Sequence, residues 1–372
     1  MSTPELVLVG ATGYTGRLVA RTLLRRGVPF TIAGRDESSL LDLIAELQDT
    51  AQPHPPPIGH RVVDIESHSD VDSIAGPEHV VLSCAGPFHL IGHSLARAVA
   101  RRGGTYADIS GEEPFVAWLM KELAVPARTS GALLIPSCAF ESFVSDMLAD
   151  RLCSREAIYR EIASYYQLGS HATSPGTALT MRLVPHWEPA AFVKGDFVAT
   201  GPGEIRRSPP HPGIPEGQVA VFAPYPEVRF WGTQYPTASA LSFLVLGRSE
   251  AALLGRSARS GAADKATSSD VTSIVARHRR RTRPGPAANR RSSQRFTVMV
   301  QAIDETGDAS EMAVEGSDPY GLSAEILTWV GRELVEDNAG GRVTGVRAPS
   351  EVFDADRFFD EARGWEPALV LR

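Results

Sequence analysis

Three glycines spaced three residues apart, Gly10, Gly13 and Gly16, lie between an apolar run and an amphipathic one. A strand that turns sharply into a helix leaves the first helical N–H groups pointing at one spot, where the helix dipole favours an anion. Glycine permits the tight turn, the approach of a phosphate and close helix–strand packing. The pattern predicts a dinucleotide pyrophosphate site, with a structural turn as the alternative. The side chains that can add contacts are Thr12, Tyr14 and Thr15.

The residue that ends the next strand-like run distinguishes NAD from NADP. In NAD-binding folds an Asp or Glu about 20 residues after the glycines binds the ribose 2′-OH. This chain has Ala33, Gly34 and Arg35 there, and the planar guanidinium of Arg35 suits a 2′-phosphate. Asp36 is expected to point away or to cap the next helix. We therefore expect NADPH, with a solvated surface arginine as the alternative for Arg35.

Small residues end a later strand-like run, as Cys84, Ala85, Gly86 and Pro87. The carboxyl ends of parallel strands face the crevice in which such cofactors lie. Small side chains there would let the nicotinamide half pass close to the backbone, so these four residues are predicted to bind the cofactor. An ordinary Gly-Pro turn is the alternative. Phe88, which follows, is expected on the substrate side.

Ionisable side chains come after the next run. Alternation along a strand would place Tyr106 and Asp108 on one face, where an acid with a shifted pKa can donate a proton. Packing, loop fixing and helix capping are the alternatives. The predicted catalytic residues are Tyr106, Asp108, Glu112 and His89. A later loop adds Glu141, Ser142 and Asp146 as substrate-side candidates, for which capping is again the alternative.

The elements that must position these residues follow a regular pattern up to residue 137. Strand-like runs alternate with helical segments such as 15–26, 38–47 (with Ser38 as N-cap) and 91–103. This alternation predicts βαβ units and a parallel, Rossmann-type sheet in a domain at 1–137. The strand-like runs are 5–9, 28–35, 60–65, 78–86, 104–110 and 131–137.

The pattern changes from about residue 160. The remaining strands are irregularly spaced, and Pro and Gly separate them. We expect an inserted α+β domain of mixed or antiparallel sheet at 138–316, and a helix and tail at 317–372 that return to the first domain. The predicted elements are strands at 164–169, 218–224 and 227–232, a helix at 173–184, a hairpin at 295–316 and a helix at 318–337.

Composition narrows the class of protein. The 372 residues carry a formal net charge of -7, which argues against nucleic-acid binding. Three cysteines without metal-ligand spacing predict neither a disulfide framework nor a metal site. No leader and no apolar run of membrane-spanning length is recognised. We expect a cytoplasmic protein without a membrane span, and a homodimer is one assembly it could form.

Several of these stretches, in this order, resemble the saccharopine dehydrogenase-like reductases, and most closely the trans-acting enoyl reductases of bacterial polyketide and lipid assembly. The resemblance implies NADPH-dependent reduction of a C=C bond in a carrier- or CoA-bound acyl thioester. The chain departs from the family pattern at Glu141 and Val144, where substrate is expected. The stretches are GATGYTG (10–16), AGR (33–35), CAGPF (84–88), GTYADISGE (104–112), PSCAFESFVSDMLA (136–149), PGTALTMRLV (175–184) and GSDPYGLSAEIL (316–327).

Two other functions stay open at this point. An imine or amino-acid dehydrogenase of the saccharopine type would need fixed cations for substrate carboxylates. A catalytically inactive NADP-binding sensor or scaffold would keep the glycine turn and lose the active site.

A basic segment, Arg277–Arg295, has eight arginines and no acidic residue. It is either a solvated loop or a docking site for an acidic acyl carrier protein or polyketide synthase. Nucleic acid is a weaker interpretation because the segment has no aromatic residue.

Overall fold

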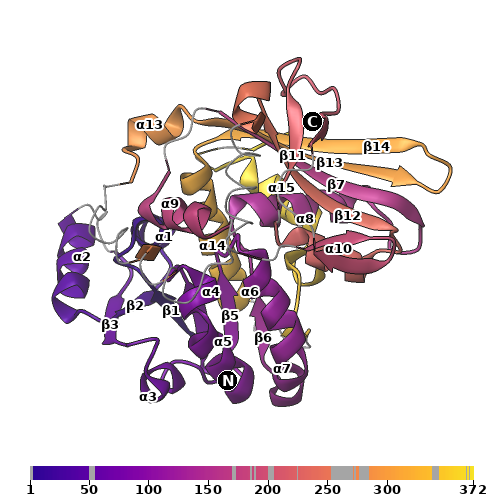
Figure 1. Ribbon diagram of the computed structural model, residues 1–372. Helices are drawn as coiled ribbons and strands as arrows, with labels where there is room; N and C mark the ends of the chain where they lie inside the picture. Colours follow the sequence, from indigo (N-terminus) through magenta and orange to yellow (C-terminus); the bar gives the residue numbers. More distant parts are fainter. Residues whose placement is uncertain are drawn as a thin grey trace. The chain divides into compact units, whose positions relative to one another are not determined.

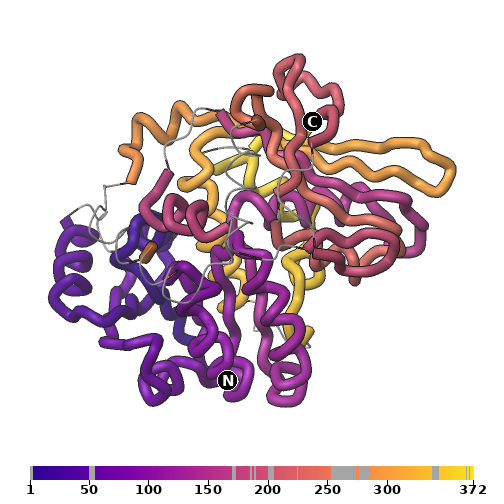
Figure 2. The backbone as a smooth tube through the Cα atoms, viewed as in Figure 1, coloured from indigo at the N-terminus to yellow at the C-terminus, as the bar shows by residue number. Residues whose placement is uncertain are grey.

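The computed structural model describes residues 3–49, 55–169, 173–184, 187, 190–199, 205–223, 225–252, 271, 274–275, 285–336, 343–365, 367 and 369–372. The chain divides into two compact units. Unit 1 comprises Met1–Ser110, Phe115–Phe140 and Tyr320–Val352, and unit 2 comprises Gly111–Pro114, Glu141–Pro319 and Phe353–Arg372. Figure 2 traces the chain path through them. The three domain ranges expected from the sequence stay a prediction.

Unit 1 is built on a parallel sheet of seven strands in the order β15-β6-β5-β4-β1-β2-β3 (Figure 1). The strand order reverses between β1 and β4, so the carboxyl ends of these neighbours form the topological switch point at which ligands of such sheets bind. The strands are β1 (Glu5–Val9), β2 (Phe30–Gly34), β3 (Ile58–Val62), β4 (His79–Ser83), β5 (Thr105–Asp108), β6 (Leu133–Ile135) and β15 (Gly345–Val346).

Helices connect these strands because their apolar residues recur at helical spacing. In α1, Leu18, Val19 and Leu23 are buried while arginines occupy the other face. The long α14 packs against the same unit: a Cβ added at Gly331 would lie 2.8 Å from Cδ1 of Leu82 in β4. The helices are α1 (Tyr14–Arg25), α2 (Glu37–Asp49), α3 (His68–Asp72), α4 (Phe88–Ile91), α5 (His93–Arg102), α6 (Glu113–Trp118), a π-helical turn (Leu119–Leu123), α7 (Ala124–Ser130), α14 (Pro319–Glu336) and a 3-10 turn (Pro349–Glu351).

Unit 2 contains a nine-stranded sheet in which β12 is parallel to β7 and the other pairs are antiparallel. Its main path runs β10-β11-β12-β7-β13-β14-β16, and β8 and β9 pair beside β12. The strands are β7 (Tyr159–Leu168), β8 (Ala190–Val193), β9 (Asp196–Ala199), β10 (Ile205–Arg207), β11 (Val219–Phe222), β12 (Ser239–Leu246), β13 (Arg295–Asp304), β14 (Ala309–Ser317) and β16 (Val370–Leu371). The helices are α8 (Phe140–Leu152), α9 (Pro175–Leu183), α10 (Glu227–Gln234), α13 (Ala288–Ser292) and α15 (Ala355–Ala362).

The predicted fold class is confirmed: a parallel Rossmann-type sheet is joined to a unit with a mixed sheet. The hairpin at 295–316 is also confirmed, as β13 and β14. The strand predicted at 227–232 is wrong, because this segment forms α10. Val228 and Phe230 alternate as in a strand, but Val228 and Trp231 are also three apart, and the helix buries both pairs.

The predicted N-cap Ser38 is also wrong. The helix α2 begins at Glu37, and the capping residue is Asp36, whose Oδ1 accepts from the Ser39 N–H at 3.1 Å. The sequence left two possibilities for Asp36, that it points away or that it caps the next helix, and the structure shows the cap.

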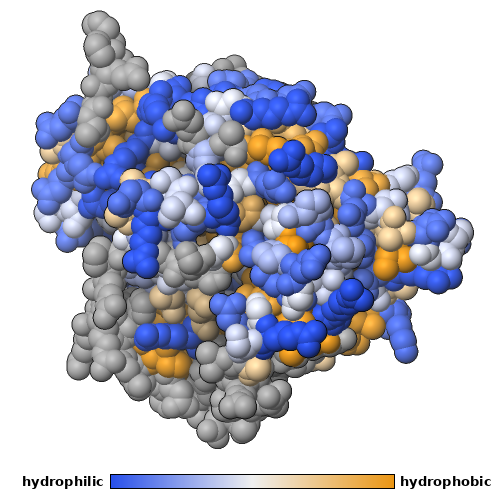
Figure 3. Space-filling model, turned by 90° about the horizontal axis from the view of Figure 1, so that it is seen from above, coloured by the Kyte–Doolittle hydropathy of each residue, from blue (hydrophilic) through white to orange (hydrophobic). Residues whose placement is uncertain are grey.

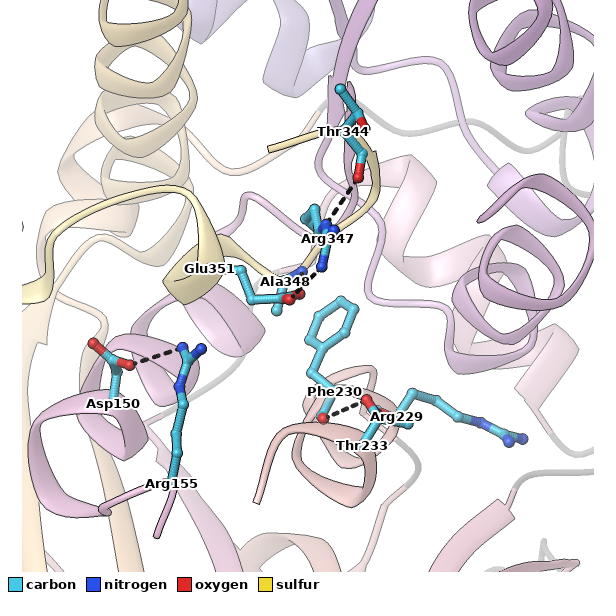
Figure 4. A network of polar contacts seen from close by, with 9 residues as sticks. All are labelled: Asp150, Arg155, Arg229, Phe230, Thr233, Thr344, Arg347, Ala348 and Glu351. Carbon is cyan, nitrogen blue, oxygen red and sulfur yellow. Dashed lines mark hydrogen bonds and ion pairs between the residues drawn. The ribbon is translucent and has the colours of Figure 1, made fainter. Parts of the chain in front are cut away.

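Polar networks fix the ends of several elements (Figure 4). In unit 1 the Arg347 guanidinium donates to the Thr344 carbonyl and to Glu351, each at 2.9 Å. In unit 2 Arg155 donates to Asp150 at 3.3 Å near the end of α8. These contacts are partly exposed, so they order loops more than they stabilise the fold.

Hydrophilic side chains separate small apolar areas on the face drawn in Figure 3. Among the described helices there is none whose length and apolar character would let it cross a membrane.

Candidate functional site

At positions 10 and 16, the turn between β1 and α1 leaves no room for a side chain. Gly10 has a left-handed backbone with φ of +77°, and a Cβ there would lie 2.8 Å from the backbone nitrogen of Ala85. A Cβ at Gly16 would lie 2.2 Å from the carbonyl oxygen of Gly10. These distances are far below ordinary contact, so larger residues would push α1 away from β1 and from the segment after β4.

The start of α1 faces solvent at Gly13. This glycine is exposed and is the N-cap of α1, and no side chain caps the helix in the described structure. The first turn of α1 also contains no acidic residue. Thr12, Tyr14 and Thr15 are partly exposed beside it, and the Tyr14 ring meets the Tyr320 ring edge-on at 5.2 Å. This end of the helix therefore suits an anion such as a pyrophosphate.

Arg35 directly follows β2, next to the glycine turn. The Gly10 N–H donates to the carbonyl of Ala33 at 3.2 Å, which joins the turn to the end of β2. Arg35 is exposed and forms no ion pair with any described residue. Its guanidinium is therefore available to a phosphate, and the neighbouring Asp36 is occupied in capping α2.

The segment after β4 completes this edge of the sheet. The Cys84 N–H donates to the carbonyl of Val9 at 2.8 Å, so Cys84 lies beside the end of β1. The Gly86–Pro87 peptide bond is cis. Phe88, predicted on the substrate side, is buried, with its ring 5.7 Å from that of Phe115. The structure thus brings the predicted cofactor residues together at the carboxyl ends of β1, β2 and β4.

Asp108 ends β5, next to the segment after β4, and its side chain is fully buried. Its Oδ1 accepts from the backbone N–H of Ser110 at 2.8 Å and from that of Ser137 at 3.0 Å. Burial raises the pKa of Asp108 to about 6, although these two N–H groups favour the ionised form. Tyr106 is buried close by, and burial and the charge of Asp108 raise the pKa of its phenol well above the ordinary value.

The other two predicted catalytic residues lie elsewhere. His89 is in α4, with its ring 6.1 Å from that of His93, and burial lowers the pKa of both histidines. Glu112 belongs to unit 2, where its Oε1 accepts from the Thr180 hydroxyl at 3.5 Å. Of the four residues predicted to be catalytic, Tyr106 and Asp108 form the one close pair.

Unit 2 contains a polar cluster around Glu227 that the sequence analysis missed. Glu227 is fully buried in α10, and its Oε1 accepts from Ser164 at 2.6 Å and from Tyr166 at 2.5 Å. Its Oε2 accepts from Ser142 at 2.9 Å. Burial raises the pKa of Glu227, and these hydroxyls oppose the shift. The only signal in the sequence was a glutamate between Pro226 and Val228, and it is ambiguous because strand ends also carry such residues.

The three predicted substrate-side residues of α8 lie in or near this cluster. Ser142 binds Glu227, and Asp146 accepts from the indole N–H of Trp231 at 3.2 Å. Glu141 is partly exposed, and burial of its carboxyl raises its pKa to about 7, with a further contribution from the charge of Glu227. Glu141 is therefore a group that can exchange a proton near neutral pH.

Five of the eight arginines of the basic segment lie outside the described residues: Arg277, Arg279, Arg280, Arg281 and Arg283. Of the described part, Arg291 forms an ion pair with Asp318 at 3.0 Å, while Arg290 and Arg295 are exposed. In the ranges that the structure describes, no three His, Cys, Asp or Glu side chains could hold a metal ion together.

Comparison with known proteins found no family model that matches the chain. The trans-acting enoyl reductase of Mycobacterium leprae is 30% identical over 189 residues, which are 47% of this chain and 44% of that protein. The human saccharopine dehydrogenase-like oxidoreductase is 29% identical over 153 residues, 38% of this chain and 36% of that protein. A lipid droplet localized protein of Caenorhabditis elegans is 25% identical over 151 residues, 40% of this chain and 35% of that protein.

The chain therefore spans less than half the length of these curated relatives. Among solved structures, saccharopine dehydrogenase (L-Glu forming) from Saccharomyces cerevisiae matches with a TM-score of 0.59 at 11% identity, over 99% of each chain. The resemblance predicted from the sequence is thus confirmed: the chain is similar to the saccharopine dehydrogenase-like oxidoreductases and the trans-acting enoyl reductases, and it has the fold of saccharopine dehydrogenase.

Proposed function

We propose that this chain is an NADPH-dependent oxidoreductase. The observation that carries the proposal is the glycine turn at the switch point, where Gly10 and Gly16 admit no larger residue and Gly13 leaves the helix N-terminus open. Arg35, exposed and without an ion-pair partner among the described residues, favours a 2′-phosphate over a 2′-hydroxyl. The cofactor, when bound, supplies the hydride, and the chain's residues bind and orient it.

We further propose that the substrate is an acyl thioester with a C=C bond next to its carbonyl group. The names of the bacterial relatives support this class, and the sequence similarity covers 44% and 34% of the length of two of them. This reaction requires a hydride at the β-carbon, a proton at the α-carbon, and hydrogen-bond donors for the developing enolate oxygen. Phe88, Glu141, Ser142 and Asp146 stay the proposed substrate-side residues, and His89 and Glu112 stay candidate acids.

The test is the loss of NADPH absorbance when purified full-length chain is mixed with an enoyl-CoA or an enoyl acyl carrier protein. Turnover with NADPH and little with NADH is the expected result. Turnover only with an amino acid and a keto acid would instead identify a saccharopine-type dehydrogenase. Tight NADPH binding without turnover on either panel would identify a sensor or scaffold. The Gly16→Ala protein is the control for activity that does not depend on the glycine turn.

The proposed partner is an acyl carrier protein or polyketide synthase that docks on Arg277–Arg295. The charge of this segment supports the proposal, since carrier proteins are acidic and opposite charges speed association. Replacing the eight arginines by glutamine is expected to raise the KM for the carrier-bound substrate and leave that for the CoA thioester unchanged. Equal effects on both substrates would contradict docking. A cytoplasmic location and a homodimer are also part of the proposal, and cell fractionation and light scattering test them.

A further inference from the structure

The two carboxyl oxygens of Asp108 have different surroundings. Oδ1 accepts two backbone N–H groups, from Ser110 and Ser137, so its lone pairs are occupied. Oδ2 is buried, and no described residue meets hydrogen-bonding geometry with it, although the Tyr106 hydroxyl nearby still favours the ionised carboxyl. A proton on this carboxyl therefore sits on Oδ2. Buried carboxyl oxygens are nearly always hydrogen-bonded in proteins, so an unpartnered one is a candidate for a functional role.

Asp108 is one strand away from the switch point. Asp108 in β5 pairs in register with Ser83, the last residue of β4. Cys84, which follows Ser83, borders the glycine turn, because a Cβ on Gly10 would lie 2.9 Å from the Cys84 carbonyl carbon. In the proposed function, the segment after β4 borders the nicotinamide half of the cofactor. A charge that appears on that ring would act on Asp108 through a buried, poorly screened environment.

The titratable groups that face Asp108 come from each neighbouring strand end. They are Tyr106 in β5, Cys84 after β4 and, behind them, Cys138 after β6, whose N–H donates to the Asp108 carbonyl at 2.6 Å. Burial raises the pKa of Tyr106 and of Cys84, so both are neutral near pH 7. No cation pairs with Asp108 in the described part of the chain, and its own pKa of about 6 lies near neutrality. Burial favours the protonated carboxyl, the Ser110 and Ser137 N–H groups favour the ionised one, and these opposing effects leave the pKa of Asp108 at about 6.

We propose that Asp108 is a proton-exchanging residue whose protonation follows the charge of the nicotinamide ring. It holds a proton on Oδ2 beside the neutral, reduced ring and releases it beside the positively charged, oxidised ring. This inference rests on the cofactor part of the proposed function and is independent of the substrate.

The proton is accounted for over a full cycle. If a positively charged ring lay beside Asp108, the Oδ2–H bond would break, the electron pair would stay on Oδ2 and the proton would pass to water. Asp108 would take a proton from water again when NADPH replaces NADP+, so its exchange cancels over the cycle. The reduction of an enoyl thioester itself still consumes one hydride and one proton. Tyr106, whose phenol stays protonated, is the positioning residue beside this carboxyl.

The test measures protons rather than turnover. NADP+ and NADPH are titrated into the full-length chain by calorimetry in buffers of different ionisation enthalpy, between about pH 5 and pH 8. NADP+ binding is expected to release protons, most strongly near the pKa of Asp108 at about 6. If the ring charge lowers that pKa by about one unit, NADP+ affinity rises roughly tenfold across this range. NADPH carries the same 2′-phosphate, which also titrates at about pH 6, so the quantity of interest is the proton release on NADP+ binding in excess of that on NADPH binding.

Asp108→Asn keeps an acceptor for Ser110 and Ser137 and has no proton to exchange, so the excess proton release of NADP+ over NADPH should disappear. Asp42→Asn, on the exposed face of α2, is the matched control and should keep it. Tyr106→Phe provides a second test in case the Asp108→Asn variant does not fold. Because the Tyr106 hydroxyl lowers the pKa of Asp108, its removal should move the proton release to higher pH.

An excess of proton release on NADP+ over NADPH binding that persists in Asp108→Asn, or no such excess in the unmodified chain, would overturn the proposal. A chain that binds neither nucleotide would contradict the proposed function as well. A chain that binds both nucleotides without a difference in protons would contradict only this inference.

Discussion

The hydroxyl of Tyr166 lies 2.5 Å from Oε1 of Glu227, and both side chains are fully buried in unit 2. The same carboxylate accepts from Ser164 and Ser142, so residues from β7 and α8 converge on one acid of α10. A buried charge is costly without such donors. The cluster therefore depends on each hydroxyl that it contains.

Tyr166→Phe is expected to lower the free energy of unfolding by about 1–3 kcal/mol, because Glu227 loses a donor and stays buried. Urea unfolding measures this change. The control is Tyr235→Phe, since the Tyr235 hydroxyl is buried without a hydrogen bond among the described residues and its loss should be nearly neutral. Equal destabilisation by both substitutions would show that the Tyr166 hydrogen bond contributes nothing specific.

Gly16→Ala is expected to destabilise the chain by roughly 1–3 kcal/mol and to weaken NADPH binding at least tenfold. The physical reason is the Cβ position 2.2 Å from the Gly10 carbonyl oxygen, which forces α1 and its N-terminus to move. Thermal unfolding and nucleotide titration measure the two effects. Gly111→Ala is the control, because no atom lies within 4 Å of a Cβ at that position. Unchanged nucleotide affinity in Gly16→Ala would contradict the predicted pyrophosphate site.

Arg35→Ala is expected to weaken NADPH binding about 10- to 100-fold and to leave NADH binding unchanged, since a charge-assisted bond to the 2′-phosphate contributes about 1.5–3 kcal/mol. Fluorescence titration with both nucleotides measures the preference. Arg101→Ala removes another exposed arginine of unit 1, one that pairs with Asp72 at 3.5 Å, and should change neither affinity. Parallel losses for NADPH and NADH in Arg35→Ala would mean that Arg35 does not distinguish the two.

The free energy of unfolding should fall as the pH rises from about 4.5 to about 7, the range in which Glu141 titrates. Its pKa in the folded chain is raised to about 7 from the ordinary 4.5, so folding favours the protonated form. The stabilisation is fully present below about pH 4.5 and is lost as the pH rises through about 7. Glu141→Gln should remove this part of the pH dependence of the free energy of unfolding, which amounts to at most about 3 kcal/mol. Unfolding curves at several pH values measure it, with the exposed Glu311→Gln as control. A parallel pH dependence in Glu141→Gln and the unmodified chain would contradict the assignment.

Local sequence determined the strand–turn–helix start of unit 1, where the proposed cofactor site lies. Gly10, Gly13 and Gly16 fix a turn whose geometry allows few alternatives, because positive φ and close backbone approach exclude side chains. Apolar runs of strand length alternating with helical spacing then determine a parallel sheet, and a parallel sheet places the ends of β1, β2 and β4 along one edge. Arg35 could be predicted beside the turn for that reason.

Only the tertiary structure decided the chemistry of the acids. The sequence shows Asp108, Glu141 and Glu227 as three similar carboxyls, but their pKa shifts come from burial and from donors distant in the chain, such as Ser137 for Asp108 and Tyr166 for Glu227. The segment at 227–232 has apolar residues that fit both a strand and a helix, so packing in unit 2 determined its state and buried its glutamate. Local periodicity thus fixed where the backbone turns, while desolvation and long-range hydrogen bonds, which no local pattern encodes, fixed which acids can exchange protons.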